Sequence, residues 1–274
     1  MWIPIPGVQT LDFKPYRVDL TPFAGVLSDG APHTIALSVF NAHDHFSTTA
    51  TLLLKLDAGS TQVTGALTQN TIGAGPAPVV DGGLDDDGFG TVSVASDRRF
   101  TLAGYVETSH GRVDTTIEQT FAFSATTSYA SQSASVIGWT IDHDTRVDSV
   151  TTIATGSSTR VVAEHQHYPF GLVLPFTTSG SIVSADFDLG YQRNLETYND
   201  GIVGVGSLVD NHVGSHFVAA AANRHSEQDY QYVDTEGACY HRQIASVANK
   251  LANVTDGAPC AVIDRVFADG FDGG

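Results

Sequence analysis

The sequence predicts an all-β protein, and three observations favour this class. Apolar and polar residues alternate in short segments along most of the chain, which is the period-2 pattern of half-buried strands. Glycine, aspartate and serine separate these segments at intervals of about 8–15 residues, which is typical of a β-sandwich. No segment has a sustained 3.6-residue period. The nearest is CYHRQIASVANKLANV (239–254), where a single helix would place Ile244, Val247 and Leu251 on one face.

The first sixty residues contain about three expected strands. Tyr16, Val18 and Leu20 alternate with polar residues up to Pro22. The segments HTIALSVF (33–40) and TATLLLKLD (49–57) also alternate. Three strands are too few to close a sandwich, so we expect this unit to need strands from elsewhere.

A second β unit is expected after a segment rich in glycine, proline and aspartate. Residues 61–90 are interpreted as a linker or long loop, and the Asp85–Gly88 run within it lacks the ligand spacing of a calcium loop. Alternating segments then resume and continue almost to the end of the chain. The predicted division is therefore 1–60, 61–90, 91–262 and a tail at 263–274, with the two β units forming two jelly-roll or β-sandwich domains.

Composition limits the classes of partner. The chain has 274 residues, 42% of them hydrophobic, and a formal net charge of −17. This charge repels phosphate backbones and anionic lipid, so we expect neither a nucleic acid nor a membrane partner, and it is compatible with an acidic medium. Cys239 and Cys260 are either two free thiols or a disulfide; few lysines and many threonines and serines favour the disulfide, an oxidising compartment and a secreted or periplasmic protein.

Histidine and aspartate gather at three places. Two His-x-His pairs, 43/45 and 165/167, would place both imidazoles on one face of a strand, a geometry that can bind zinc. A third group is Asp142-His143-Asp144. Nothing in the sequence supplies a third or fourth ligand, so we expect hydrogen-bonded or cleft-lining histidines, with no metal and no cofactor.

One expected strand carries two further polar candidates. Gln119 shares its face with Ile117 and Phe121, where an unpaired amide would cost about 1–3 kcal/mol, so it is either bonded in the core or directed into a cleft. Glu118 points to the opposite face, either as a solvated acid or as a catalytic one. Neither a P-loop nor a G-x-S-x-G motif is present. These residues alone indicate a secreted β-sandwich protein that binds or hydrolyses carbohydrate.

The order of several motifs resembles the plant-type acidic peptide:N-glycosidases, the peptide-N4-(N-acetyl-β-glucosaminyl)asparagine amidase A family. The N-terminal part matches through Trp2, Pro4, Ile5, Asp12, Tyr16, Asp19, Thr21, Pro22, Phe23, Asp29, Gly30, His33, Asn41, Ala42, Leu52, Leu54, Leu56 and Asp57. Later segments match through Gly104, Val106, Gly111, Thr115, Gln119, Phe121, His165, Pro169 and Leu172, and through ADFDLGY, YQYVDTEGACYHR and the final Cys260. The tail RVFADGFDGG lies outside the family and resembles tags of proteobacterial secreted proteins, which favours a bacterial source.

The resemblance implies a function and a partner. It implies the C-terminal half of an enzyme made as two polypeptides cut from one precursor, so that a separate N-terminal chain completes the first jelly roll. It implies hydrolysis of the amide between an N-glycan and asparagine at acidic pH, with the principal acid on that N-terminal chain. The Cys239–Cys260 disulfide is supported by the same resemblance. The alternatives are a non-catalytic glycan-binding jelly roll and a secreted structural module.

Residues of this chain are expected to line the rim of such a site. A catalytic role is expected for Asp44 and Glu118. Substrate contact is expected for Trp2, His43, His45, Phe46, Gln119, His165 and His167.

Overall fold

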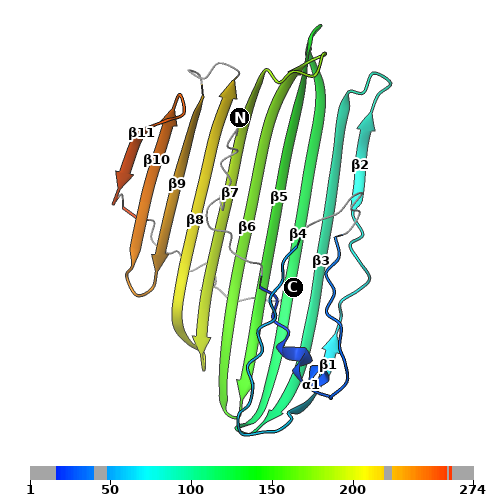
Figure 1. The fold of residues 1–274 in the computed structure, drawn as a ribbon, viewed down its shortest axis with the longest axis vertical. Helices are drawn as coiled ribbons and strands as arrows, with labels where there is room; N and C mark the ends of the chain where they lie inside the picture. The colour runs from blue at the N-terminus through cyan, green and yellow to red at the C-terminus, as the bar shows by residue number, and fades with distance from the viewer. Residues whose placement is uncertain (1–16, 40–47, 219–223, 258, 261–274) are drawn as a thin grey trace.

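The computed structural model describes residues 17–39, 48–218, 224–257 and 259–260. These residues form one antiparallel sheet and a short helical segment (Figure 1). The strands are β1 (Thr64–Asn70), β2 (Val79–Leu84), β3 (Gly90–Thr108), β4 (Gly111–Ser133), β5 (Val136–Thr155), β6 (Ser158–Thr177), β7 (Ser184–Asn199), β8 (Ile202–Val218), β9 (His225–Asp234), β10 (Cys239–Val247) and β11 (Lys250–Asp256).

The strands follow one another across the sheet in chain order. The order is β1-β3-β4-β5-β6-β7-β8-β9-β10-β11, and β2 also pairs with β3, along a part of β3 that β1 does not occupy. The all-β class is therefore confirmed. The topology differs from the jelly rolls that we expected, because hairpins join neighbouring strands into a single meander. The division into two domains stays a prediction.

Tight turns fix the register of these long hairpins. Asp200-Gly201 joins β7 to β8 with both φ angles positive, 51° and 77°, as a type I′ turn requires. Ala248-Asn249 joins β10 to β11 in the same way, with φ of 52° and 63°. The helix considered for 239–254 is therefore wrong, because this turn divides the segment into two paired strands.

Alternation gives the sheet two different faces. One face, which we call the aromatic face, carries ring contacts such as Phe123 with His143 and Tyr168 with Tyr191. The other, which we call the polar face, carries the histidines and aspartates described below. A one-residue slip in any hairpin would exchange the faces, so the turns determine which residues share a site.

The helical segment packs on the aromatic face near one edge of the sheet. It consists of η1 (Thr21–Phe23) and α1 (Ala24–Leu27), with Pro22 buried. A Cβ at Gly104 would lie 2.1 Å from the Pro22 carbonyl oxygen, so the close approach needs glycine there. Leu102, Val106 and Ile117 are buried on the same face and form the nearby core.

Two sequence expectations differ from the structure near the N-terminus. The described residues 17–39 and 48–57 contain no strand. Alternation had predicted strands ending near Pro22 and at 33–40 and 49–57. The segment interpreted as a linker contains β1 and β2. Strand pairing needs a neighbouring edge, and β3 offers its free edge to 64–70 and 79–84 instead.

Candidate functional site

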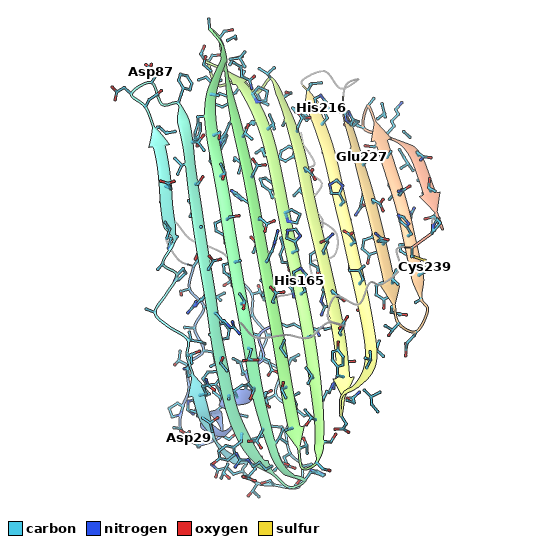
Figure 2. The ribbon with its side chains drawn as sticks, turned by 180° about the vertical axis from the view of Figure 1, so that it is seen from behind. Asp29, Asp87, His165, His216, Glu227 and Cys239 are labelled. Atoms are coloured by element: carbon cyan, nitrogen blue, oxygen red, sulfur yellow. A yellow bond between two sulfur atoms is a disulfide. The ribbon has the colours of Figure 1, made fainter. Side chains whose placement is uncertain are left out.

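Histidines on the polar face pair with aspartates of the neighbouring strand. His165 Nδ1 lies 2.5 Å from Asp148 Oδ1, and His167 Nε2 lies 2.6 Å from Asp144 Oδ2, both between β5 and β6. The same arrangement recurs further along the sheet in His212–Asp188, His216–Asp186 and His241–Asp229, at 2.6, 2.5 and 2.7 Å. Figure 2 views the sheet from the side opposite to Figure 1 and labels His165 and His216.

One of the pairs between β5 and β6 includes a further basic side chain. Arg146 donates from Nε to Asp144 Oδ1 at 2.9 Å, so this carboxylate contacts two basic groups. Burial alone would raise the pKa of Asp144, but the hydrogen bond and charge of His167, together with Arg146, lower it overall. This carboxylate therefore stays ionised in moderately acidic solution.

The contacts orient the imidazole rings. Asp148 holds the Nδ1 side of His165, so the Nε2 side of the ring is turned away from that carboxylate. A carboxylate that fixes one ring nitrogen leaves the other able to donate or accept a proton. The side chains of His165 and His167 are 31% and 20% exposed, so both remain accessible from solvent.

A buried amide lies beside this group. Asn194 in β7 is opposite His165 in the register and only 5% exposed. Its Oδ1 has no hydrogen-bond partner among the described residues. Glu196, two positions further on, is also 5% exposed, and its Oε2 accepts a hydrogen bond from Tyr198 at 2.5 Å.

The structure places some predicted site residues together and separates others. His165 and His167 share the polar face, as the His-x-His spacing predicted. Glu118 is exposed on the same face, since it is opposite Val150 in the register while Thr120 is opposite Asp148. Gln119 is half-buried on the aromatic face. Their catalytic and binding roles stay predictions.

Five predicted site residues lie outside the described residues. They are Trp2, His43, Asp44, His45 and Phe46.

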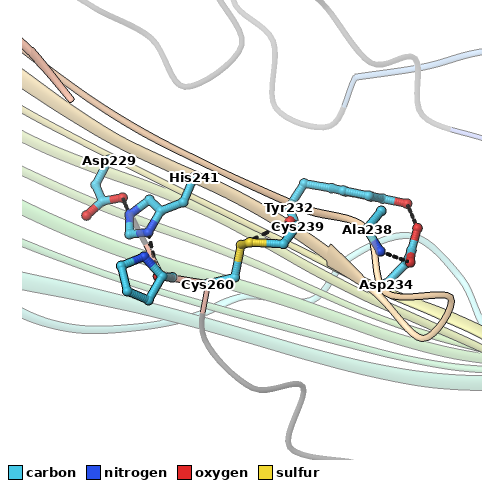
Figure 3. Close-up of a disulfide and its surroundings, with 8 residues drawn as sticks. Asp229, Tyr232, Asp234, Ala238, Cys239, His241 and Cys260 are labelled. Atoms are coloured by element: carbon cyan, nitrogen blue, oxygen red, sulfur yellow. Dashed lines mark hydrogen bonds and ion pairs between the residues drawn. A yellow bond between two sulfur atoms is a disulfide. The ribbon is translucent and has the colours of Figure 1, made fainter. Parts of the chain in front are cut away.

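The predicted disulfide is confirmed. Cys239 and Cys260 are bonded, with their Cα atoms 5.9 Å apart (Figure 3). Beside it, His241 bridges Asp229 through Nε2 and the Pro259 carbonyl through Nδ1, at 2.7 and 2.8 Å. The hydrogen bond to Pro259, against a smaller effect of burial and with the help of Asp229, raises the pKa of His241. The disulfide indicates an oxidising, non-cytosolic compartment.

Neither a metal-binding cluster nor a membrane-spanning helix is found among the described residues. No group of three or more histidine, cysteine, aspartate or glutamate side chains in this part of the chain could hold a metal ion. Within the same residues, no helix has the length and apolar character that crossing a bilayer requires.

Sequence reasoning missed Asp148 and Asn194. The signal for Asp148 was present, because the β5–β6 hairpin turns at Gly156-Ser157 and pairs Thr155 with Ser158. Counting outward from that turn places Asp148 opposite His165. Nothing in the sequence distinguished Asn194 from other polar strand residues, since its burial depends on the neighbouring strands.

These features define a disulfide-bonded, antiparallel β protein with a polar face of paired histidines and aspartates. Comparison with known proteins shows what this chain is similar to. The model of the family "Peptide N-acetyl-beta-D-glucosaminyl asparaginase amidase A" matches residues 1–69. The chain is also 26% identical over 255 residues to peptide-N4-(N-acetyl-beta-glucosaminyl)asparagine amidase A of Prunus dulcis, covering 90% of this chain.

These matches confirm the similarity to the amidase A family that the sequence motifs indicated. The chain spans about 43% of the length of the Prunus dulcis relative. No solved structure shows a significant match.

Proposed function

We propose that this chain is part of a peptide:N-glycosidase that hydrolyses the amide bond between an N-glycan and asparagine. The observation that carries the proposal is the similarity to an amidase A along 90% of the chain, which extends well beyond the family-model match at residues 1–69. The reaction leaves aspartate in the polypeptide and releases the glycan as a glycosylamine.

The polar face offers groups that suit this chemistry. Amide hydrolysis needs a carboxylate to activate or position water and a donor to stabilise charge on the amide oxygen or the leaving nitrogen. Glu118 is an exposed carboxylate of this face, and His165 is an oriented imidazole two strands away. We propose Glu118 and Asp44 as catalytic groups of this chain, with the principal acid on a second chain.

A second chain from the same precursor is the proposed partner. Ile35, Leu37, Leu54 and Leu56 are 58%, 69%, 66% and 83% exposed, although they alternate with polar residues as strand residues do. Burying such side chains is worth about 1.5–3 kcal/mol each, so these segments are suited to strand pairing with another chain. This second chain would correspond to the part of the Prunus dulcis relative that the present chain does not cover.

The proposed setting is a secreted or periplasmic, acidic one. The disulfide and the net charge of −17 support it.

A glycan-binding module without catalysis is the second candidate. The polar face favours it, because carboxylates, amides and imidazoles on a flat sheet can hydrogen-bond to sugar hydroxyls without breaking any bond.

The test incubates an N-glycopeptide at acidic pH with the chain alone and with the chain co-produced with the upstream half of its gene. We expect conversion of asparagine to aspartate only with both halves, and a large loss of turnover in Glu118→Gln. Glu236→Gln, in the β9–β10 turn, is the matched control. Retained glycan binding without conversion in either preparation would support the second candidate.

A further inference from the structure

We propose that the C-terminal segment 261–269 of this chain adds a strand to the sheet along the first residues of β8. The inference goes beyond the proposed function and does not depend on it. It rests on the pairing and exposure of these β8 residues and on the place where the disulfide holds the end of the described chain.

The beginning of β8 has a strand partner on one side only. β7 pairs with β8 over its whole length, from Ile202 to Val218. On the other side β9 pairs with residues 207–216 alone, and Thr235 closes this ladder. The Thr235 N–H donates to the Gly206 carbonyl and its Oγ1 accepts from the Gly206 N–H, both at 2.9 Å. Residues 202–205, which we call the free edge, therefore have no described strand on this side, and Figure 1 shows β8 continuing past the β9–β10 turn.

The free edge is apolar and carries no charge. Ile202, Val203 and Val205 are 73%, 42% and 47% exposed. The segment contains neither a charged residue nor a proline, the two kinds of residue that commonly keep an edge strand from pairing further. The outer edge of the sheet differs, because β11 begins at Lys250 and ends at Asp256. Exposed β-branched side chains on an unpaired edge suit the addition of a strand.

The described chain ends beside this edge. Cys260 is bonded to Cys239. Cys239, Val233 and Leu208 lie opposite one another on β10, β9 and β8. The disulfide therefore fixes Cys260 at a level of the sheet only three residues along β8 from the free edge.

The chain also arrives there in the direction that antiparallel pairing needs. β11 and the residues after it run back along β10, from contact with Arg242 to the bond with Cys239. His241 holds Pro259 on this course, because its Nδ1 donates to the Pro259 carbonyl oxygen at 2.8 Å (Figure 3). Since β10 is antiparallel to β9, and β9 to β8, a segment that keeps this direction is antiparallel to β8.

The residues that follow Cys260 have the reach and the composition of such a strand. The distance from the level of Leu208 to Ile202 is about 20 Å along β8, and the shift from β10 to β8 is about 10 Å across the sheet. Nine extended residues span about 30 Å, so 261–269 can reach the whole free edge. Four of these nine residues favour strands: Val262, Ile263, Val266 and Phe267.

Tethering favours this segment over a separate partner. A segment joined by a short linker to its binding site has an effective concentration in the millimolar range. A second copy of the chain would have to approach against the repulsion of two net charges of −17. The C-terminal segment is therefore the occupant to which the free edge is best suited.

The experiment measures hydrogen exchange of the backbone amides of the free edge by mass spectrometry, in the full chain and in a chain truncated after Cys260. The truncated chain keeps the disulfide and every strand of the sheet. We expect the amides of 202–205 that face away from β7 to exchange at least tenfold faster after this truncation. Truncation after Asp269 is the matched control and should leave their exchange slow.

A double substitution, Ile263→Pro/Val266→Pro, tests strand pairing in the full chain. The N–H groups of positions 263 and 266 point to opposite sides of a strand, so one of the two faces β8. Proline cannot donate to a ladder, and the variant should therefore also speed exchange at the free edge at least tenfold. Phe271→Pro, beyond the proposed strand, should not.

Three results would overturn the proposal. The first is equal exchange at 202–205 in the full chain and in the chain truncated after Cys260. The second is slow exchange that survives this truncation and increases with protein concentration, which would assign the edge to a second copy of the chain. The third is slow exchange that survives the double proline substitution.

Discussion

Two side chains on the polar face, Asp144 and His241, make contributions to stability that depend on pH in opposite directions. The pKa of Asp144 is lowered from 3.8, so its contribution to stability is present above that value and is lost as the pH falls through the lower, folded-state pKa. The pKa of His241 is raised from 6.5, so its contribution is complete below that value and is lost as the pH rises through the higher, folded-state pKa. Both contributions are present between about pH 4 and 6.5.

The histidine effect is tested with His241→Gln. We expect the variant to be less stable than the native protein below pH 6.5, and the difference in free energy of unfolding to shrink as the pH rises further, because the native His241 then loses its proton. Urea denaturation at a series of pH values measures it. His110→Gln, at an 87% exposed turn position, is the control. A difference that grows with pH would contradict the assignment.

Asp144→Asn should show the opposite dependence. The variant removes an ionised carboxylate that contacts His167 and Arg146, so its loss of stability should be full above pH 3.8 and should diminish in stronger acid. The same denaturation series, extended to low pH, measures it. A loss that is constant across the acid range would show that the ion pairs contribute nothing.

Prediction of single residues from the sequence succeeded where the pattern of one strand was sufficient to place a side chain. The His-x-His spacing placed His165 and His167 on a common face because side chains alternate within a strand. Their aspartate partners lie on another strand, and finding them required the hairpin register. The burial of Asn194 depends on both neighbouring strands, so local sequence gave no sign of it.

At the level of elements, the turns determine the register of the hairpins. Ala248 takes φ of 52° in the β10–β11 turn, a left-handed conformation that a Cβ disfavours. Ala248→Gly should therefore raise the free energy of unfolding by about 0.5–1 kcal/mol, since relief of this strain exceeds the added chain entropy. Ala245→Gly, within β10, is the control and should lower it. Denaturant titration measures both, and destabilisation by Ala248→Gly would contradict the turn assignment.

The disulfide stabilises the end of the described chain. Cys239 and Cys260 are 21 residues apart, and closing a loop of this size restricts the unfolded chain by about 3 kcal/mol. The double variant Cys239→Ser/Cys260→Ser should lose about this much stability. Denaturation of the oxidised protein, with the reduced native protein as a second reference, measures the loss. Equal stability of the oxidised protein and the variant would contradict this role.

Element prediction succeeded after residue 90, where the alternating segments that we expected lie within strands of the sheet. It failed at 239–254, because Ile244, Val247 and Leu251 satisfy a helical spacing as well as parts of two strands. It also failed at 33–39 and 49–57. Alternation in these segments shows that their residues suit a strand, but a strand also needs a neighbouring strand to pair with. Among the described residues, β1 and β2 occupy the edge of β3 instead.

On the scale of the whole molecule, the fold class followed from the sequence but the topology did not. Hairpins in a meander and strands in a jelly roll have the same alternation, and only the pairing order distinguishes them. The family similarity came from the order of motifs along the chain. Because the chain spans about 43% of its relative, the activity of the whole protein remains a proposal.

The most direct measurement is mass spectrometry of an N-glycopeptide treated with the two co-produced halves in heavy-oxygen water. We expect a complete glycan in solution and a peptide whose asparagine has become aspartate carrying the heavy oxygen, because water attacks the amide carbon. A glycopeptide that is unchanged, or a peptide that keeps its asparagine with one sugar still attached, would contradict the amidase assignment.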